Sequence, residues 1–309
     1  MSDSTYRADA ATPLDRRRQL RDALASERLL QFPGAFSPLV ARMVGDYAFD
    51  GVYVSGAALA ADLALPDIGL TTLSEVVARS QQIARATPLP VLVDADTGFG
   101  EPANVARTID LLEATEVAGC HLEDQVNPKR CGHLDSKTVV EPHVMVRRVR
   151  AAVLARRDPN FIVCARTDAR AIEGIDSAID RAKAYVDAGA DMIFPEALAD
   201  ESEFAKFRSA IDVPLIANMT EFGKSPLLDA TTLHDLGFNV VIWPVTSLRV
   251  AMGAVEELLA ELERTGTQSS FVPRMQTRAR LYELIDYEGY GAFDHRIFNF
   301  EIPGGINDE

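Results

Sequence analysis

The stretch PVLVDADTGFGEPANVARTIDLLEATEVAGCHLEDQ, residues 90–125, contains the unit from which most of the chain is built. Its first part, 90–98, is an apolar run that predicts a buried strand. Residues 102–117 open with Pro102, which suits a first helical turn, and their apolar residues share one helix face. A second apolar run follows at 119–125. This order of strand, helix and strand predicts a parallel sheet covered by helices.

The same unit recurs along the chain. Segment 72–86 opens with a capping-box pattern, and 176–188 starts at Asp176, which is a good N-cap. Eight such units predict a closed (β/α)8 barrel of the TIM type. An open doubly wound sheet is the alternative, but no Gly-rich phosphate loop follows the first run. The eight apolar runs are 29–36, 51–56, 90–98, 119–125, 161–169, 191–197, 214–222 and 239–246.

Around the barrel we predict a flexible N-terminal tail (1–20), a catalytic barrel (21–265) and a C-terminal helical extension (266–309). Within the extension, 274–290 has helical spacing. The first dozen residues are polar, with no apolar centre of the kind a signal peptide needs. No apolar run approaches the ~18 residues of a membrane span.

Charge and cysteine usage narrow the class of protein. The 309 residues carry a net charge of −15, with acidic and basic residues mixed, so no basic stripe for nucleic acid is present. An anionic substrate must therefore be held by locally placed Arg and Lys. Three widely spaced cysteines favour a reducing cytosol over a disulfide framework. We expect a cytoplasmic enzyme without nucleic-acid or membrane partners.

Nearly every predicted strand begins apolar and ends polar. In a barrel the carboxyl ends of the strands meet at one rim, where active sites are built. These side chains, far apart in sequence, are therefore expected to converge. They are Ser55, Asp94, Asp96, Glu123, Asp124, Gln125, Arg166, Asp168, Glu196, Asn218 and Thr220.

Three of these residues form an acidic cluster. Asp94 and Asp96 are two apart, which in a strand points both carboxylates to one face, and Glu123 joins them from the next strand. Like-charge repulsion would make this cluster costly, and a hard dication such as Mg²⁺, or Mn²⁺, relieves it. For Asp96, N-capping of the next helix or an ion pair with Arg166 are the structural alternatives.

The loop NPKRCGH, 127–133, places Cys131 among Lys129, Arg130 and His133. Nearby positive charge lowers a thiol pKa and makes the sulfur reactive. A surface thiol in a basic loop is the alternative. Cys120 and Cys164 lie inside apolar strands and are expected to be inert.

With these residues in place, the sequence resembles the isocitrate lyase and phosphoenolpyruvate mutase superfamily, and within it the bacterial 2-methylisocitrate lyases. The resemblance covers residues 20 to 290. The segments that carry it are YVSGAALAADLALPDIG, LVDADTGFG, GCHLEDQVNPKRCGH, ARTDA, FPEA, ANMTEFG and MQTR.

The resemblance implies a Mg²⁺-dependent lyase that cleaves a carbon–carbon bond in a small tricarboxylate by a retro-aldol reaction. Asp94 and Asp96 would hold the metal, with Asp67 and Glu123 around it. Cys131 would be the general acid, Tyr53 would take part in base chemistry and His133 would contact a substrate carboxylate. The other implied substrate-binding residues are Ser55, Gly56, Ala57, Gly132, Arg166, Glu196, Asn218, Thr220, Arg249 and Arg278. The family typically forms a homotetramer that exchanges a C-terminal helix between subunits.

Two positions depart from the family pattern. Ala57 stands where a second glycine is usual, and Leu134 follows His133 where a basic residue is common. Among related activities, isocitrate lyases are usually much longer, and phosphonate-forming mutases generally lack the Cys-Gly-His loop. A dimethylmalate lyase or an oxaloacetate-cleaving enzyme stays open, because one side chain can redirect specificity. A barrel that binds without catalysis is also conceivable, but it would be expected to lose some of these acidic residues.

Overall fold

The computed structural model describes residues 12–130, 132 and 137–299. One of its two compact units, Thr12–Ala254, contains eight short strands, each inside one of the eight predicted apolar runs. The strands are β1 (Leu30–Pro33), β2 (Val52–Val54), β3 (Val91–Asp94), β4 (Gly119–Glu123), β5 (Ile162–Thr167), β6 (Met192–Pro195), β7 (Ile216–Asn218) and β8 (Val240–Trp243).

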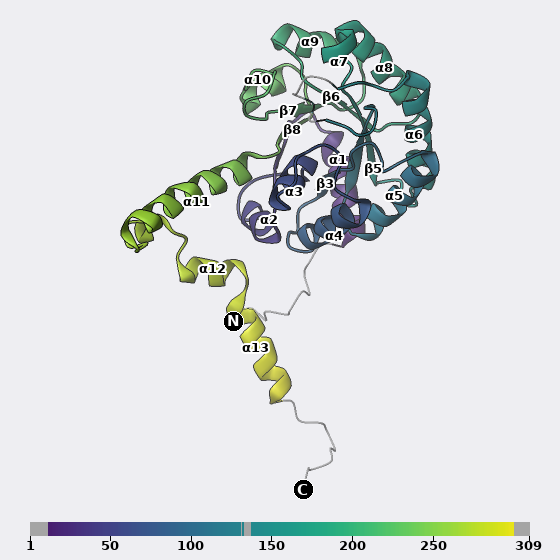
Figure 1. Cartoon of the computed structure of the whole chain (residues 1–309). Coiled ribbons are helices and arrows are strands. Elements are labelled where there is room, and N and C mark those ends of the chain that lie inside the picture. The colour runs from purple at the N-terminus through teal and green to yellow at the C-terminus, as the bar shows by residue number, and fades with distance from the viewer. Residues whose placement is uncertain (1–11, 131, 133–136, 300–309) are drawn as a thin grey trace, which may run out of the picture. The chain divides into compact units, whose positions relative to one another are not determined.

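The strands follow one another in chain order around a ring. Parallel ladders join β2 through β6 into one sheet and β7, β8 and β1 into another. Single parallel bridges connect the two sheets at both seams, Gly34 with Tyr53 and Ile193 with Leu215. Figure 1 shows this ring with helices around it. The predicted (β/α)8 barrel is confirmed, with isolated bridges instead of ladders at the two seams.

Helices lie between the strands, as the alternating pattern predicts. The capping box at Thr72 and Glu75 is present, whereas the helix predicted from Asp176 begins at Ile175 after Gly174, whose φ is +90°. The helices of this unit before β8 are α1 (Pro13–Leu24), α2 (Pro38–Val44), α3 (Gly56–Asp62), α4 (Leu73–Ala84), α5 (Pro102–Ala114), α6 (Pro142–Ala155), α7 (Arg170–Glu173), α8 (Ile175–Asp187), α9 (Glu201–Ala210) and α10 (Ala230–Asp235).

Alternation along the strands divides the core into two layers. Val93, Leu122 and Ala165 belong to the layer that packs against the helices, whereas Leu92, Cys164 and Phe194 belong to the cluster inside the ring. This is the pattern expected when successive side chains of a strand point to opposite faces. This alternation determines which polar side chain at each strand end points into the barrel.

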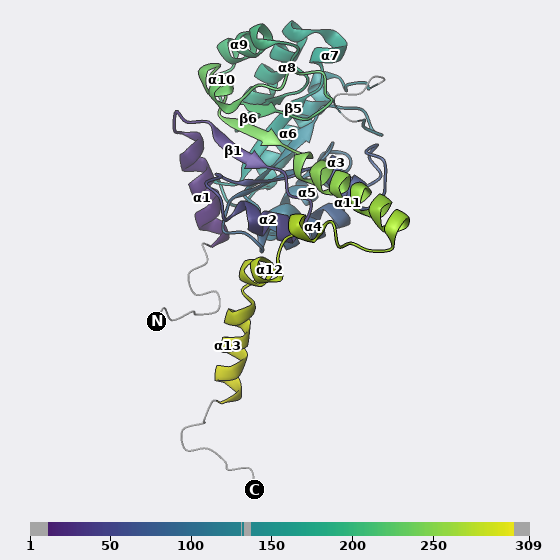
Figure 2. The same ribbon diagram turned by 90° about the vertical axis from the view of Figure 1, so that its left-hand side faces the viewer.

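The predicted N-terminal tail is wrong for residues 13–20, which belong to α1. Thr12 and Asp15 form a capping box, and Pro13 starts the helix. Leu20 packs with the inner cluster, and Arg16 and Arg17 donate to backbone carbonyls that precede β3 and β4. The helix thus covers the amino ends of the strands, and Figure 2 shows α1 beside β1. Burial of Leu20 stabilises α1, a helix that the polar composition of this segment does not predict.

The second unit contains the described residues from Val255 onward. Its boundary falls inside α11 (Thr246–Thr265), not at residue 265 as predicted. The predicted helix 274–290 is two helices, α12 (Arg278–Leu284) and α13 (Tyr287–Phe298), preceded by a 3-10 turn at Val272–Arg274. The break falls at Asp286, whose φ of 53° is incompatible with a continuous right-handed helix. No helix in the described part of the chain is long and apolar enough to cross a membrane.

Candidate active site

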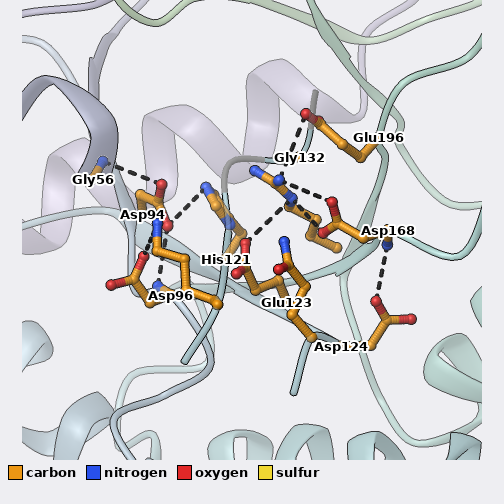
Figure 3. Close-up of polar contacts among 12 residues, drawn as sticks. Gly56, Asp94, Asp96, His121, Glu123, Asp124, Gly132, Asp168 and Glu196 are labelled. Atoms are coloured by element: carbon orange, nitrogen blue, oxygen red, sulfur yellow. Dashed lines mark hydrogen bonds and ion pairs between the residues drawn. The ribbon is translucent and has the colours of Figure 1, made fainter. Parts of the chain in front are cut away.

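Strand alternation brings polar side chains together inside the carboxyl end of the ring. Asp94 shares a strand face with Leu92, and Arg166 shares one with Cys164, and both of these apolar residues belong to the inner cluster. His121 and Glu123 lie on either side of Leu122, which points outward. Figure 3 shows the resulting group. The predicted convergence holds for Asp94, Glu123, Arg166 and Glu196, whereas Asp124 turns to the outer layer and accepts from Tyr185 of α8.

Asp94 and Asp96 meet by a different route from the one predicted. β3 ends at Asp94, and Asp96 lies beyond it with φ 46°, so the alternation of a strand does not place Asp96. Instead, the turn folds the backbone N–H of Asp96 onto Asp94 Oδ1 at 3.0 Å. Gly56 N–H donates to Asp94 Oδ2 at 3.1 Å, and a Cβ on Gly56 would lie 2.9 Å from that oxygen. The close approach therefore requires glycine at position 56.

Lys129 occupies the space between two of the predicted metal ligands. Its Nζ lies 2.8 Å from Asp96 Oδ1 and also donates to Asp67. Asp96 thus pairs with Lys129, neither capping a helix nor pairing with Arg166. Burial raises the pKa of Asp96 to about 6, against the opposing effect of Lys129.

Aspartate and glutamate are suitable ligands for a divalent metal, but the described side chains of the cluster do not form a complete ligand set. Among the described residues, no three His, Cys, Asp or Glu side chains are placed together as ligands. Yet Glu123 Oε1 is buried without a hydrogen-bond partner in the described structure. Burial first, and then neighbouring carboxylates, raise the pKa of Glu123. A dication with bound water would satisfy this oxygen, and Mg²⁺ needs few carboxylates when it keeps waters.

Arg166 is the centre of a second, cationic group. Its guanidinium lies 3.0 Å from Asp168, 3.4 Å from Glu123 and 3.5 Å from Glu196. Burial alone would raise the pKa of Asp168, but Arg166 and Lys137 outweigh it and hold that pKa well below its usual value. A Cβ on Gly132 would clash with Arg166 and Glu196, so the loop approaches these side chains closely.

Tyr53 and His121 form a buried pair beside the acidic cluster. Tyr53 Oη lies 2.7 Å from His121 Nε2, and the two rings stack with centroids 5.9 Å apart. Burial lowers the pKa of His121 to about 4, so this imidazole is neutral near pH 7. Burial first, and then Asp94, raise the pKa of Tyr53 well above its usual value. Tyr53 is therefore a phenol that can donate a hydrogen bond, not a resting phenolate base.

A pocket of about 420 Å³, counted with its open mouth, joins the two groups. Most of the predicted substrate-binding residues line it. The lining residues are Tyr53, Ser55, Ala57, Asp67, Asp94, Lys129, Arg130, Gly132, Arg166, Glu196, Asn218, Thr220, Pro244 and Val245. Ser55 also has a structural role, since its hydroxyl caps α3 by accepting from Ala58 N–H.

Several predicted residues lie elsewhere. Arg249 does not line the pocket, and its guanidinium lies 3.5 Å from Glu221 and over the ring of Phe222. Arg278 begins α12 in the second unit. Cys131 and His133 fall outside the described residues. The roles of these four residues stay predictions. Cys120 and Cys164 are buried, and burial raises the pKa of both thiols, as expected for inert residues.

Sequence reasoning missed three buried groups at the site. His121 could have been found, because strand alternation puts it on the same face as Glu123. The sequence predicts Lys129 as a neighbour of Cys131, whereas in the structure it pairs with Asp67 and Asp96. Lys137, which bridges Asp168 at 2.9 Å and the carbonyl of Gly132, carries no local signal. Its partner lies 31 residues away, across the barrel rim.

Comparison with known proteins defines the family. The family model described as phosphoenolpyruvate phosphomutase matches residues 20–263, and the chain belongs to this family. This matches the resemblance carried by the sequence motifs. The predicted class, a carbon–carbon lyase of this superfamily, is confirmed.

Individual relatives narrow the comparison. The chain is 63% identical to the "probable 2-methylisocitrate lyase 2" of Corynebacterium glutamicum, covering 95% of both chains. It is 46% identical to the 2-methylisocitrate lyase of Bacillus subtilis, covering 92% of this chain and 94% of the relative.

Solved structures show the same fold. An oxaloacetate acetylhydrolase in complex with 3,3-difluorooxalacetate has a TM-score of 0.89 at 32% identity, covering 94% of this chain and all of that one. A 2,3-dimethylmalate lyase has a TM-score of 0.86 at 32% identity, with coverages of 96% and 99%. A phosphonopyruvate hydrolase in complex with oxalate and Mg²⁺ has a TM-score of 0.85 at 29% identity, with coverages of 94% and 100%.

Proposed function

We propose that this chain cleaves 2-methylisocitrate to pyruvate and succinate, as a Mg²⁺-dependent lyase of the methylcitrate cycle of propionate catabolism. The observation that carries the proposal is the joining, in one pocket, of a carboxylate cluster with the buried guanidinium of Arg166. A tricarboxylate with a hydroxyl group needs both a cation site for its oxygens and fixed positive charge for its carboxylates. The identity of 63% to a relative of that name supports the choice of substrate.

The acidic cluster would hold the metal. Asp94 and Asp96, with Asp67 and Glu123 around them, supply the oxygen ligands that Mg²⁺, or Mn²⁺, prefers. When bound there, the metal supplies Lewis-acid polarisation of the substrate's hydroxyl and carboxylate oxygens. The Mg²⁺ bound by the phosphonopyruvate hydrolase of the same fold supports this assignment.

Arg166 is placed to bind a substrate carboxylate. Asp168 accepts from Nε and Nη2 of this guanidinium, and the remaining N–H groups can donate to a substrate carboxylate, with an attraction that burial strengthens. With His121 Nε2–H as the donor of the bond between them, the Tyr53 phenol can donate to an oxygen of the substrate. The side-chain amide of Asn218, on β7, lines the same pocket and can donate as well. These donors orient the substrate and stabilise negative charge that develops in the reaction.

Bond cleavage and proton transfer complete the reaction. Removal of the hydroxyl proton makes that oxygen a carbonyl, and the carbon–carbon bond breaks to release pyruvate. The electron pair moves into the adjacent carboxylate of the other fragment, giving an enediolate. Cys131 then donates its Sγ proton to the carbon, and succinate is formed. Cys131 directly precedes Gly132 in the chain, and Gly132 lines the pocket.

The apolar part of the pocket supports a methylated substrate. Ala57, Pro244 and Val245 are its aliphatic lining residues within the described structure, and Val245 is buried. A methyl group against this wall gains about 1–3 kcal/mol over hydrogen. This gain favours 2-methylisocitrate over isocitrate.

We also propose that the enzyme is a cytoplasmic homotetramer whose C-terminal helices are exchanged between subunits. Exposed apolar side chains on the second unit support this assembly, because a monomer gains nothing from exposing them. They include Tyr287, Tyr290, Ile297 and Phe298 of α13.

A product assay tests the proposed activity. With Mg²⁺ present, purified protein should convert 2-methylisocitrate to equimolar pyruvate and succinate, and EDTA should abolish the conversion. Isocitrate, 2,3-dimethylmalate and oxaloacetate serve as competing substrates. A higher kcat/KM for any of these than for 2-methylisocitrate would refute the assignment of the substrate while keeping the metal-dependent class.

Metal affinity should depend on pH through Asp96. Because the pKa of Asp96 is about 6, a proton competes with the metal below that pH and hardly at all above pH 7. We expect the Kd for Mg²⁺ to rise as pH falls from 7.5 to 5.5, by up to about tenfold per pH unit below 6. Isothermal titration calorimetry at both values measures it. Asp96→Asn should bind Mg²⁺ more weakly with a flatter pH profile, and an unchanged Kd in the wild type would contradict the prediction.

A further inference from the structure

Lys129 is a buried ammonium in contact with the carboxylate cluster. The residue is 3% exposed, and its Nζ lies 2.8 Å from Asp96 Oδ1 while also contacting Asp67. Lysine is almost never this buried without a partner, and here it has two. Both partners belong to the set of four carboxylates proposed to hold the metal.

The other two carboxylates of the set, Asp94 and Glu123, make different contacts. Asp94 accepts from the backbone N–H groups of Gly56 and Asp96, and its Oδ1 lies 3.7 Å from His121 Nε2. Glu123 keeps one buried oxygen without a hydrogen-bond partner in the described structure. Lys129 thus contacts two of the four carboxylates directly, while Glu123 and Asp94 act on its charge without an ion-pair contact.

We propose that Lys129 is the resident cation of the metal-free cluster and competes with the divalent metal for Asp67 and Asp96. An ammonium 2.8 Å from Asp96 Oδ1 and a divalent metal bound to the same carboxylate carry like charges, which repel strongly at this range. Binding of the metal through Asp96 therefore requires the Lys129 ammonium to withdraw. Lys129 keeps the buried carboxylates neutralised before the metal arrives, and lowers the affinity for the metal as a result.

With Lys129 in place, Asp67 and Asp96 are turned to the ammonium. The inference rests on the metal site of the proposed function, but it concerns affinity and the position of one side chain, not turnover.

Metal affinity of a charge-free variant is the first test. Lys129→Met keeps the approximate length of the side chain and removes its charge. We expect the Kd for Mg²⁺, measured by calorimetry at pH 7.5, to fall by about tenfold or more, because a nearby positive charge is lost. The metal-free variant should have a lower Tm than wild type and recover more on adding Mg²⁺. Lys183→Met, on the exposed face of α8, changes the net charge equally and should leave the Kd unchanged.

Amine labelling of the wild-type protein is the second test and needs no variant. Reductive methylation followed by peptide mass spectrometry should modify Lys129 slowly without metal and several-fold faster at saturating Mg²⁺. Lys137, equally buried but paired with Asp168, is the internal reference and should not change.

The outcomes separate this inference from the proposed function. A Kd for Lys129→Met equal to or weaker than that of wild type, or Lys129 labelling that is insensitive to Mg²⁺, would overturn the competition while leaving the lyase intact. Failure of the wild type to bind Mg²⁺ at all would instead remove the metal site on which both rest. A tighter Kd together with faster labelling supports the inference.

Discussion

Arg166→Met should reduce kcat/KM by about 10²-fold or more and destabilise the protein by about 3–5 kcal/mol. The activity falls because the substrate loses a charged donor in a buried pocket. The stability falls because Asp168, Glu123 and Glu196 all lie within 3.5 Å of this guanidinium and lose their shared counter-charge. Removing one partner of a buried ion pair is costly even where the pair itself contributes little.

Urea unfolding and steady-state kinetics measure the two effects. Arg166→Lys keeps the charge without the planar fork, so it should recover much of the stability and little of the activity. Arg157→Met is the matched control, since the Arg157 side chain is 79% exposed and pairs with Asp110 at the surface. Its cost should stay below about 1 kcal/mol. A kcat/KM for Arg166→Met within a few-fold of wild type would show that Arg166 does not bind substrate.

Cys131→Ser should lower kcat by about 10²–10⁴-fold and leave Mg²⁺ binding intact. Serine is nearly isosteric, but its hydroxyl gives up a proton far less readily than a thiol. Substrate contacts made by Arg166 and the metal cluster do not involve the sulfur, so KM should change little.

Calorimetry and product assays on the same preparation check this prediction. The Mg²⁺ affinity of Cys131→Ser serves as the control for folding and for the metal site. Retention of more than a tenth of wild-type kcat would remove Cys131 from the mechanism. Loss of Mg²⁺ binding together with activity would instead show a structural role.

Local patterns in the sequence determined the barrel. All eight strands lie within the predicted apolar runs, because a strand buried on both faces needs a nearly continuous apolar segment, and helices with one apolar face must cover it. The capping box at Thr72 is also local, since its partner Glu75 is three residues away. α1 was missed for the opposite reason. Leu20 is buried by residues that lie far along the chain, and no local pattern reports that contact.

In the candidate site, too, some features follow from local patterns and others from contacts between distant segments. Strand period and barrel topology, both indicated by local patterns, predict that Asp94, Glu123, Arg166 and Glu196 meet at the carboxyl end of the ring. The contacts of each side chain, in contrast, arise only in the folded chain. The left-handed backbone at Asp96, the insertion of Lys129 between Asp67 and Asp96, and the bridge from Lys137 to Asp168 all depend on segments packed together across the rim. Their physical basis is the balance of burial and charge among groups distant in sequence, which exists only once the chain has folded.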